Sequence, residues 1–423
     1  MEKMEIAKIE ALEILDSRAN PTLRVKVTLR GGAFGIASVP SGASTGKYEA
    51  HELRDRDDAR YFGKGVLRAI ENIEKIITPA LIGVCANDNV RCDHIMIALD
   101  GTRNKSNLGA NTILSVSLAI ARAAANALGI PLYRYLGGYT VNRMPIPMMN
   151  IINGGAHASN SLDIQEFMIL PIGASSFTEA VRMCAEIYHV LKRDLEIKGK
   201  TTAVGDEGGF APTLENDGEA IELITDAICS AGYSPGEDVC IGLDVAASEW
   251  YANGEYKLIK GGEVFSATEL IKKYEKFCDK YPIYSIEDGL SEDDTEGWRS
   301  LTQILGGKRM LVGDDLFVTN TDRLLFGYQK KIGNAILIKP NQIGTLTETA
   351  AAVALAKQCG YKVILSHRSG ETADTSIADM AVAFGADFIK SGAPCRSERT
   401  EKYNRLLDIE NELFSPRYGS VIK

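Results

Sequence analysis

Six short apolar segments between residues 241 and 390 each end in a side chain that can do chemistry. The end residues are three carboxylates, two lysines and a histidine: Asp244, Glu287, Asp314, Lys339, His367 and Lys390. Carboxylates without a cysteine or histidine partner suit Mg²⁺, and three of them close together repel one another unless a dication holds them. A lysine beside a second lysine and a dication has a lowered pKa and can accept a proton. The pattern therefore indicates cation-assisted proton transfer. The alternatives are salt bridges among these groups, or lysines that only bind an anion.

The spacing of the six segments indicates how these side chains are positioned. After a first gap of 43 residues, successive end residues lie 23 to 28 residues apart, which is about one strand plus one crossover helix. Continuous apolar runs are typical of buried parallel strands. Such strands in series predict a closed βα barrel, in which the chemistry lies at the C-terminal ends of the strands. All six side chains are then expected at one mouth.

Composition excludes several other classes of function. The chain has 423 residues, enough for a barrel and one more domain, and its net charge of −9 argues against a nucleic-acid-binding surface. No apolar run approaches the roughly 18 residues of a membrane span, and residues 1–6 lack the pattern of a signal peptide. The eight cysteines form no Cys-x-x-Cys pair, which predicts free thiols in a reducing cytoplasm.

The N-terminal third predicts a separate α+β domain. Residues 4–40 alternate in strand period and predict an antiparallel meander, whereas residues 65–138 are mostly helical, with a long helix over 113–128. Glycines and prolines near residues 137–147 mark a boundary, so we expect an N-terminal domain at 1–137 and a catalytic barrel at 138–423.

The loop at residues 41–46, Ser-Gly-Ala-Ser-Thr-Gly, resembles two known motifs only superficially. It fails as a Walker loop, because its glycines are too close together and Lys47 is followed by Tyr48. It matches a nucleophile elbow by letter, but it follows a meander instead of βα units. We expect a mobile lid over a substrate, with a plain surface loop as the alternative.

Three polar stretches follow the boundary. His157 ends a glycine-rich loop, Gln165 and Glu166 are adjacent, and Glu207 lies among glycines that allow a ligand to approach the backbone closely. The histidines at positions 51, 94 and 189 carry no surrounding motif and are assigned no role.

Over nearly its whole length the chain resembles the enolases, the glycolytic phosphopyruvate hydratases, in their bacterial form. The matching stretches are residues 16–22, 39–46, 150–155, 163–168, 205–212, 285–288, 313–316, 341–345, 366–371, 390–394, 396–399 and 402–405. The resemblance implies an irregular, TIM-like βα barrel with a smaller N-terminal α+β domain. It also implies Mg²⁺-dependent dehydration of 2-phospho-D-glycerate to phosphoenolpyruvate (EC 4.2.1.11), by removal of the C2 proton and loss of the C3 hydroxyl.

The resemblance also implies roles for individual residues. Lys339 is the expected base, Glu207 the acid that protonates the departing hydroxyl, Glu166 its support, and His157 part of a closing loop. Substrate contacts are expected from Gln165, His367, Arg368, Ser369 and Lys390. Two Mg²⁺ ions are expected per active site, one on Asp244, Glu287 and Asp314, and the other on Ser44.

Two positions depart from the family pattern. Ala19 replaces the usual glycine, and its methyl group predicts a backbone φ below zero. Pro340 follows the expected base and restricts Lys339 to extended geometry, which suits a strand end.

Further expectations follow from the resemblance: a homodimer or higher homo-oligomer in the cytoplasm, with secondary display at the cell surface left open. One alternative is a superfamily relative that acts on another carboxylate substrate, against which the motifs around Glu207 and Arg368 argue. Another is a non-catalytic or moonlighting docking protein on the same fold. Loss of a catalytic residue would favour that alternative, and every expected residue is present.

Overall fold

The computed structural model describes residues 2–42 and 46–419. Its larger part is a closed barrel of eight strands in the order β11-β12-β13-β14-β15-β5-β6-β7. The strands are β5 (Ile146–Asn153), β6 (Glu166–Leu170), β7 (Cys240–Asp244), β11 (Ile283–Glu287), β12 (Met310–Gly313), β13 (Ala335–Ile338), β14 (Lys362–Ser366) and β15 (Phe388–Lys390). All six predicted apolar segments are therefore barrel strands, and the predicted fold class is confirmed.

Helices surround the barrel because each carries an apolar stripe that packs on the outward face of the strands. They are α6 (Phe177–Ile197), α7 (Asp217–Ser230), α8 (Ala267–Lys280), α9 (Thr295–Leu305), α10 (Thr321–Lys330), α11 (Leu346–Gln358), α12 (Ser376–Ala383) and α13 (Ser397–Glu412). The barrel interior is filled by inward-pointing side chains, among them Met148, Met168, Leu337 and Phe388. The barrel is thus a packed core with its polar groups at one end.

Strand β6 is the exception to the parallel order. It runs antiparallel to both β5 and β7, and Glu166 lies opposite Asp244 in the register. The start of β6 therefore lies at the same end of the barrel as the C-terminal ends of the other strands. This reversal brings Gln165 and Glu166 to the mouth.

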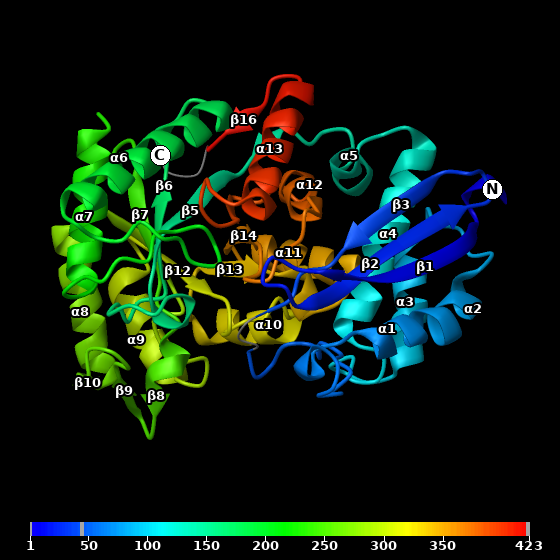
Figure 1. The fold of residues 1–423 in the computed structure, drawn as a ribbon, viewed down its shortest axis with the longest axis horizontal. Coiled ribbons are helices and arrows are strands. Elements are labelled where there is room, and N and C mark those ends of the chain that lie inside the picture. The colour runs from blue at the N-terminus through cyan, green and yellow to red at the C-terminus, as the bar shows by residue number, and fades with distance from the viewer. Residues whose placement is uncertain (1, 43–45, 420–423) are drawn as a thin grey trace.

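The N-terminal part is a three-stranded antiparallel sheet covered by helices, and it lies to one side of the barrel (Figure 1). The sheet consists of β1 (Ile6–Leu15), β2 (Pro21–Leu29) and β3 (Phe34–Ser38), and its helices are α1 (Leu67–Asn72), α2 (Thr78–Leu81), α3 (Asn89–Asp100), α4 (Ala110–Leu128) and α5 (Leu132–Gly137). The predicted meander and helical region are both found. A Cβ at Gly35 would lie 2.2 Å from the backbone nitrogen of Ala123, so α4 packs against β3 at a distance that only glycine allows.

By length and composition, α4 could cross a membrane, and it is the one such helix in the described ranges. However, 78% of its most apolar window is buried inside the protein. Its position between the N-terminal sheet and neighbouring helices explains the apolar composition.

Three small pairings complete the fold. Strand β4 (Arg143–Met144) pairs with β16 (Arg417–Tyr418), and β8 (Tyr251–Ala252), β9 (Glu255–Lys257) and β10 (Val264–Phe265) form a small sheet after β7. All eight cysteines are free thiols, as predicted.

The prediction for Ala19 was wrong, because its φ is +58°, in the left-handed region. Ala19 lies in the turn between β1 and β2. There, Oδ1 of Asp16 accepts hydrogen bonds from the backbone nitrogens of Arg18 and Asn20. These bonds hold the turn in a conformation that alanine adopts only with strain. Lys339 has φ −121° and ψ 105°, which is the extended geometry predicted before Pro340.

Candidate active site

A polar cavity of about 350 Å³ opens at the C-terminal ends of the barrel strands. Its walls include the following residues expected from the sequence: His157, Gln165, Glu166, Glu207, Asp244, Asp314, Lys339, His367, Arg368, Ser369 and Lys390. Glu287 does not line the cavity, but it is fully buried and contacts Lys390. Ser44, the expected ligand of a second metal, lies outside the described residues.

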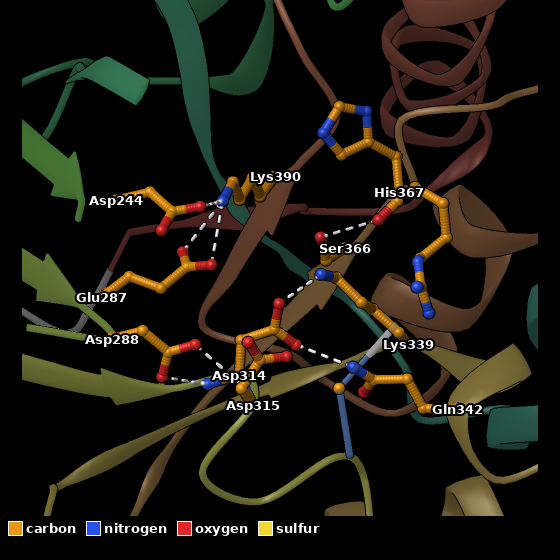
Figure 2. A network of polar contacts seen from close by, with 12 residues as sticks. Asp244, Glu287, Asp288, Asp314, Asp315, Lys339, Gln342, Ser366, His367 and Lys390 are labelled. Carbon is orange, nitrogen blue, oxygen red and sulfur yellow. Dashed lines mark hydrogen bonds and ion pairs between the residues drawn. The ribbon is translucent and has the colours of Figure 1, made fainter. Parts of the chain in front are cut away.

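Lys390 holds carboxylates from three neighbouring strands together. Its Nζ lies 2.7 Å from Oδ2 of Asp244 and 2.9 Å from Oε1 of Glu287 (Figure 2). The same Nζ lies 3.3 Å from Oε2 of Glu166. Burial lowers the pKa of Lys390, but Asp244, Glu166 and Glu287 outweigh burial and hold that pKa well above its usual value. Lys390 is therefore a permanent cation at the centre of the site.

Lys339 pairs with the side chain of Asp314, whose other oxygen accepts a hydrogen bond of 2.8 Å from Nε2 of Gln342 (Figure 2). Burial lowers the pKa of Lys339, and Arg368 and Lys390 lower it further, yet Asp314 raises it above the ordinary value. The pKa predicted from the sequence was a lowered one. Asp314 reverses the direction, because its carboxylate lies against the ammonium group.

The carboxylates of Asp288, Asp314 and Asp315 form one close cluster. One ligand atom from each lies within 4.8 Å of the other two. Asp288 accepts hydrogen bonds from the backbone nitrogens of Asp314, at 3.0 Å, and Asp315, at 2.8 Å, which fixes the turn after β12 (Figure 2). Burial and the Asp314 carboxylate raise the pKa of Asp315 to about 7. Sequence reasoning missed Asp288 and Asp315, although each directly follows a predicted strand-end carboxylate.

The predicted metal ligands Asp244, Glu287 and Asp314 lie at the ends of three adjacent strands, β7, β11 and β12. Asp244 and Glu287 contact Lys390, whereas Asp314 contacts Lys339. Burial and the Asp244 carboxylate raise the pKa of Glu287 well above its usual range. Three buried oxygen donors at adjacent strand ends fit a divalent cation, which would offset the negative charge they share. The assignment of this triad as the metal ligands stays a prediction.

Glu166, Glu207 and His157 form a second cluster, with one ligand atom from each within 4.8 Å of the others. Nδ1 of His157 lies 3.6 Å from Glu166 and 3.8 Å from Glu207. Burial and the Glu207 carboxylate raise the pKa of Glu166 well above its usual range. Burial also raises the pKa of Glu207, but the nearby side chains of His367, His157 and Arg399 outweigh burial and hold that pKa well below its usual range. The surroundings therefore shift the pKa values of the two carboxyl groups in opposite directions.

Arg368 lies in the loop after β14 and has almost no exposed side-chain surface. Its Nη1 donates to Oε2 of Glu49 at 2.9 Å and to Oδ1 of Asn341 at 3.2 Å, and its Nη2 donates to Oε1 of Glu49 at 3.3 Å. Glu49 comes from the N-terminal part of the chain, far from the barrel in sequence. No pattern around Glu49 indicated this contact.

Two basic residues outside the predicted set support the loops of the site. Arg399 donates to the backbone oxygens of Arg368 and Ser369, each at 2.6 Å, and to that of Asp206 at 3.0 Å, so it joins two of the loops. Nζ of Lys260 donates to the backbone oxygens of Gly155, at 2.9 Å, and Ala158, at 2.8 Å, on either side of His157. Arg399 lies in a motif noted from the sequence, whereas nothing around Lys260 indicated a role.

Comparison with protein-family models assigns both parts of the chain. The model described as the enolase C-terminal TIM barrel domain matches residues 141–418. The model described as the enolase N-terminal domain matches residues 6–136. The two matches cover nearly the whole chain, including all elements that build the cavity.

Proposed function

The chain belongs to the enolase family, and we propose that it is a phosphopyruvate hydratase that converts 2-phospho-D-glycerate to phosphoenolpyruvate. The observation that carries the proposal is the position of the base relative to the acid pair. Lys339 follows β13 and Glu166 begins β6, and these strands are four steps apart in both directions around the eight-stranded ring. A substrate between them meets the base on one face and the acid on the other. This arrangement suits the removal of a proton and a hydroxyl group from opposite faces.

In this proposal, Lys339 takes the C2 proton through its Nζ. Proton removal adds negative charge to a substrate that is already an anion, so fixed positive groups must lie where this charge develops. Lys390 supplies one such charge. Mg²⁺, when bound, supplies more by neutralising the developing charge at the substrate carboxylate. Asp244, Glu287 and Asp314 would hold the first ion, with Asp288 and Asp315 supporting the same turn.

The Glu166–Glu207 pair supplies the proton that leaves with the C3 hydroxyl as water. Two buried carboxylates this close cannot both ionise easily, so one proton is retained at neutral pH and is available for transfer. His157 lies within 4 Å of both and can stabilise whichever carboxylate is ionised. In this proposal Glu207 keeps the acid role that the resemblance implies, and Glu166, whose pKa is raised by burial and by Glu207, holds the proton before transfer.

The cluster of these groups in one cavity favours an enzyme over a docking protein on the same fold. By the same resemblance, we propose a cytoplasmic homo-oligomer that acts in glycolysis. The eight free thiols support a reducing compartment for this protein.

The test follows the ultraviolet absorbance of phosphoenolpyruvate formed from 2-phosphoglycerate, with Mg²⁺ and then with excess EDTA. Product that requires the metal is expected. Asp314→Asn should raise the Mg²⁺ concentration needed for half-maximal rate by about tenfold or more, whereas the exposed control Asp279→Asn should not. A folded protein that forms no product under either condition contradicts the proposal.

A further inference from the structure

Glu49 forms a nearly solvent-free ion pair with Arg368. The side chains are 7% and 4% exposed, and both terminal nitrogens of the guanidinium donate to the carboxylate, at 2.9 and 3.3 Å. A carboxylate and a phosphate present oxygens to an arginine with the same two-pronged geometry. Glu49 therefore occupies Arg368 in the manner expected of a bound anion.

Other contacts hold Glu49 in this position. Its Oε1 accepts hydrogen bonds from the backbone nitrogen of Gly46, at 3.0 Å, and from Nε2 of Gln342, at 3.2 Å. The backbone nitrogen of the next residue, Ala50, donates to the backbone oxygen of Gln342 at 2.8 Å. Nε2 of Gln342 also donates to Asp314. Glu49 thus belongs to a connected network that reaches the proposed metal ligands.

The charge of Glu49 conflicts with that of a substrate phosphate on the same arginine. A phosphate dianion beside a buried carboxylate is repelled strongly, because little solvent screens the two charges. A phosphate is therefore expected to bind the Arg368 guanidinium by displacing the Glu49 carboxylate. A singly charged anion carries the same charge as Glu49, so it has no electrostatic advantage in competing for Arg368.

We propose that Glu49 is a positioning and specificity residue that competes with the substrate phosphate for Arg368. It holds the Arg368 guanidinium in place when no phosphate is bound. A phosphate dianion displaces it from the two terminal nitrogens. Glu49 thereby lowers the apparent affinity for phosphate and discriminates against ligands that carry only a carboxylate. The inference deepens the proposed function, because it rests on Arg368 as the phosphate-binding residue.

The expected effect follows from the population of the competing state. If the Glu49–Arg368 pair makes up about 90% of the phosphate-free protein, the apparent Kd for phosphate is about tenfold above its intrinsic value. Glu49→Gln removes the charge with little change in shape. Titration calorimetry of the full chain with inorganic phosphate should then give a Kd about tenfold lower than in the unchanged protein. Glu49→Asp, which keeps the charge but recedes by one methylene, should shift the Kd in the same direction by less.

Asp293→Asn is the matched control. Asp293 binds the same N-terminal segment, accepting from Oη of Tyr48 at 2.9 Å and from Nζ of Lys47 at 3.3 Å, without touching Arg368. This variant should leave the Kd for inorganic phosphate unchanged. An equal shift in both variants overturns the inference, because loosening of the segment would then explain it.

A second readout separates competition from a merely structural role. Inorganic phosphate should raise the Tm of Glu49→Gln more than that of the unchanged protein, and the KM for 2-phosphoglycerate should fall without a matching rise in kcat. Unchanged or weaker phosphate binding in Glu49→Gln overturns the inference, as does the absence of phosphate binding in both proteins. If Glu49→Gln does not fold, the Kd of Glu49→Asp decides by the same criterion.

Phosphate binding requires no turnover, so the two proposals can fail separately. Tighter phosphate binding without formation of phosphoenolpyruvate would sink the proposed function and keep the role of Glu49. Formation of phosphoenolpyruvate without tighter phosphate binding by Glu49→Gln would keep the proposed function and overturn the role of Glu49.

Discussion

The two buried lysines of the site differ in the charges that surround them. Lys390 has three carboxylates within 3.3 Å, whereas Lys339 has one ion-pair partner, Asp314, in the described part of the chain. The pKa of Lys390 lies well above its usual value, since burial is outweighed by Asp244, Glu166 and Glu287. If a cation binds Asp314 as proposed, it would weaken the Lys339–Asp314 ion pair, and Lys339 would then lose its ammonium proton more easily than Lys390. The surroundings therefore favour Lys339 as the base and Lys390 as a fixed charge.

Lys339→Ala should lower kcat by about 10²- to 10⁴-fold, which is the usual contribution of a positioned general base. The barrel should remain folded, because Lys339 lies after β13 and outside the packed interior. Turnover of 2-phosphoglycerate and circular dichroism test the two statements. Lys330→Ala, at the exposed end of α10, is the control and should keep full activity. Substantial turnover by Lys339→Ala would remove Lys339 from this role.

Glu207→Gln should lower the rate of C3 hydroxyl loss by about 10²- to 10⁴-fold, while Lys339 still removes the C2 proton. The two steps are separable because the acid and the base lie on opposite sides of the ring. Exchange of the C2 proton with deuterated solvent, followed by NMR, measures the first step alone. Equal loss of exchange and of dehydration would show that Glu207 also serves the first step.

At the scale of single elements, reversal of one strand and support of one loop complete the site. Because β6 runs antiparallel to its neighbours, its first residues reach the mouth that the parallel strands reach with their last. The loop that carries His157 lies outside the regular strands. Nζ of Lys260, in the segment that follows β7, donates hydrogen bonds to its backbone oxygens. Catalytic side chains on such loops depend on residues that fix the backbone.

Lys260→Met should loosen the loop at residues 155–160, because two bonds from a charged donor are lost, each contributing about 1.5–3 kcal/mol. We expect kcat to fall about tenfold, which corresponds to about 1.4 kcal/mol of misplacement. Faster hydrogen exchange of the amides in this loop is the structural readout. Lys257→Met, at an exposed position of β9 in the same segment, should change neither quantity. If hydrogen exchange in the loop is unchanged in Lys260→Met, then Lys260 does not hold this loop in place.

Ala19→Gly should stabilise the protein by about 1 kcal/mol. Relief of the left-handed backbone strain at φ +58° stabilises the folded protein by about 1–2 kcal/mol. Glycine also gives the unfolded chain more conformational freedom, which cancels part of this gain. Thermal unfolding measures the change. Ala33→Gly, in the next turn of the same sheet and without a positive φ, should instead be neutral or destabilising. A lower Tm for Ala19→Gly would show that the turn is not strained.

At the scale of the whole molecule, buried polar contacts join the N-terminal part to the barrel. Ser41 and Gly370 exchange backbone hydrogen bonds, and Glu49 pairs with Arg368, so both ends of residues 41–49 are bound to the same loop. Farther from the cavity, Oδ1 of Asp374 pairs with Nη2 of Arg122 at 2.9 Å, and its Oδ2 accepts from the backbone nitrogen of Ser38 at 2.9 Å. The N-terminal part thus supplies one wall of the cavity through fixed contacts.

Asp374→Asn should lower the free energy of unfolding by about 3 kcal/mol at pH 7, because it leaves Arg122 without its buried partner. Burial raises the pKa of Asp374, but Arg122 and Ser376 outweigh burial and hold that pKa below its usual value. A carboxylate with a lowered folded-state pKa stabilises the protein above the unfolded-state pKa. This contribution is lost as the pH falls through the folded-state value. The difference between the two proteins should therefore shrink as the pH falls below about 4.

The control for this prediction is Asp322→Asn, which breaks another ion pair between the two parts, with Arg103. Those side chains are 72% and 84% exposed, so the loss should be small at any pH. Thermal unfolding of the three proteins at pH 7 and pH 3 measures the comparison. A pH-independent loss in Asp374→Asn would mean that its charge contributes nothing.

The sequence alone determined the barrel and six of its strand ends. Continuous apolar runs reflect burial on both faces of a strand, and this signal is local. Residue types and spacing therefore suffice to place Asp244, Glu287, Asp314, Lys339 and Lys390 at one mouth. The family motifs added Glu166 and Glu207, which periodicity did not indicate.

Tertiary structure decided how these groups act on one another. The reversal of β6, the approach of Glu49 to Arg368 and the strained φ of Ala19 all result from contacts between segments far apart in the chain. The same holds for the raised pKa of Lys339, where burial is outweighed by Asp314, and for the pKa of Glu166, which burial and Glu207 raise. Electrostatic energies depend on the distances and burial of every surrounding group. Residue types and spacing can name the members of such a cluster, but only the folded chain determines which of them are paired.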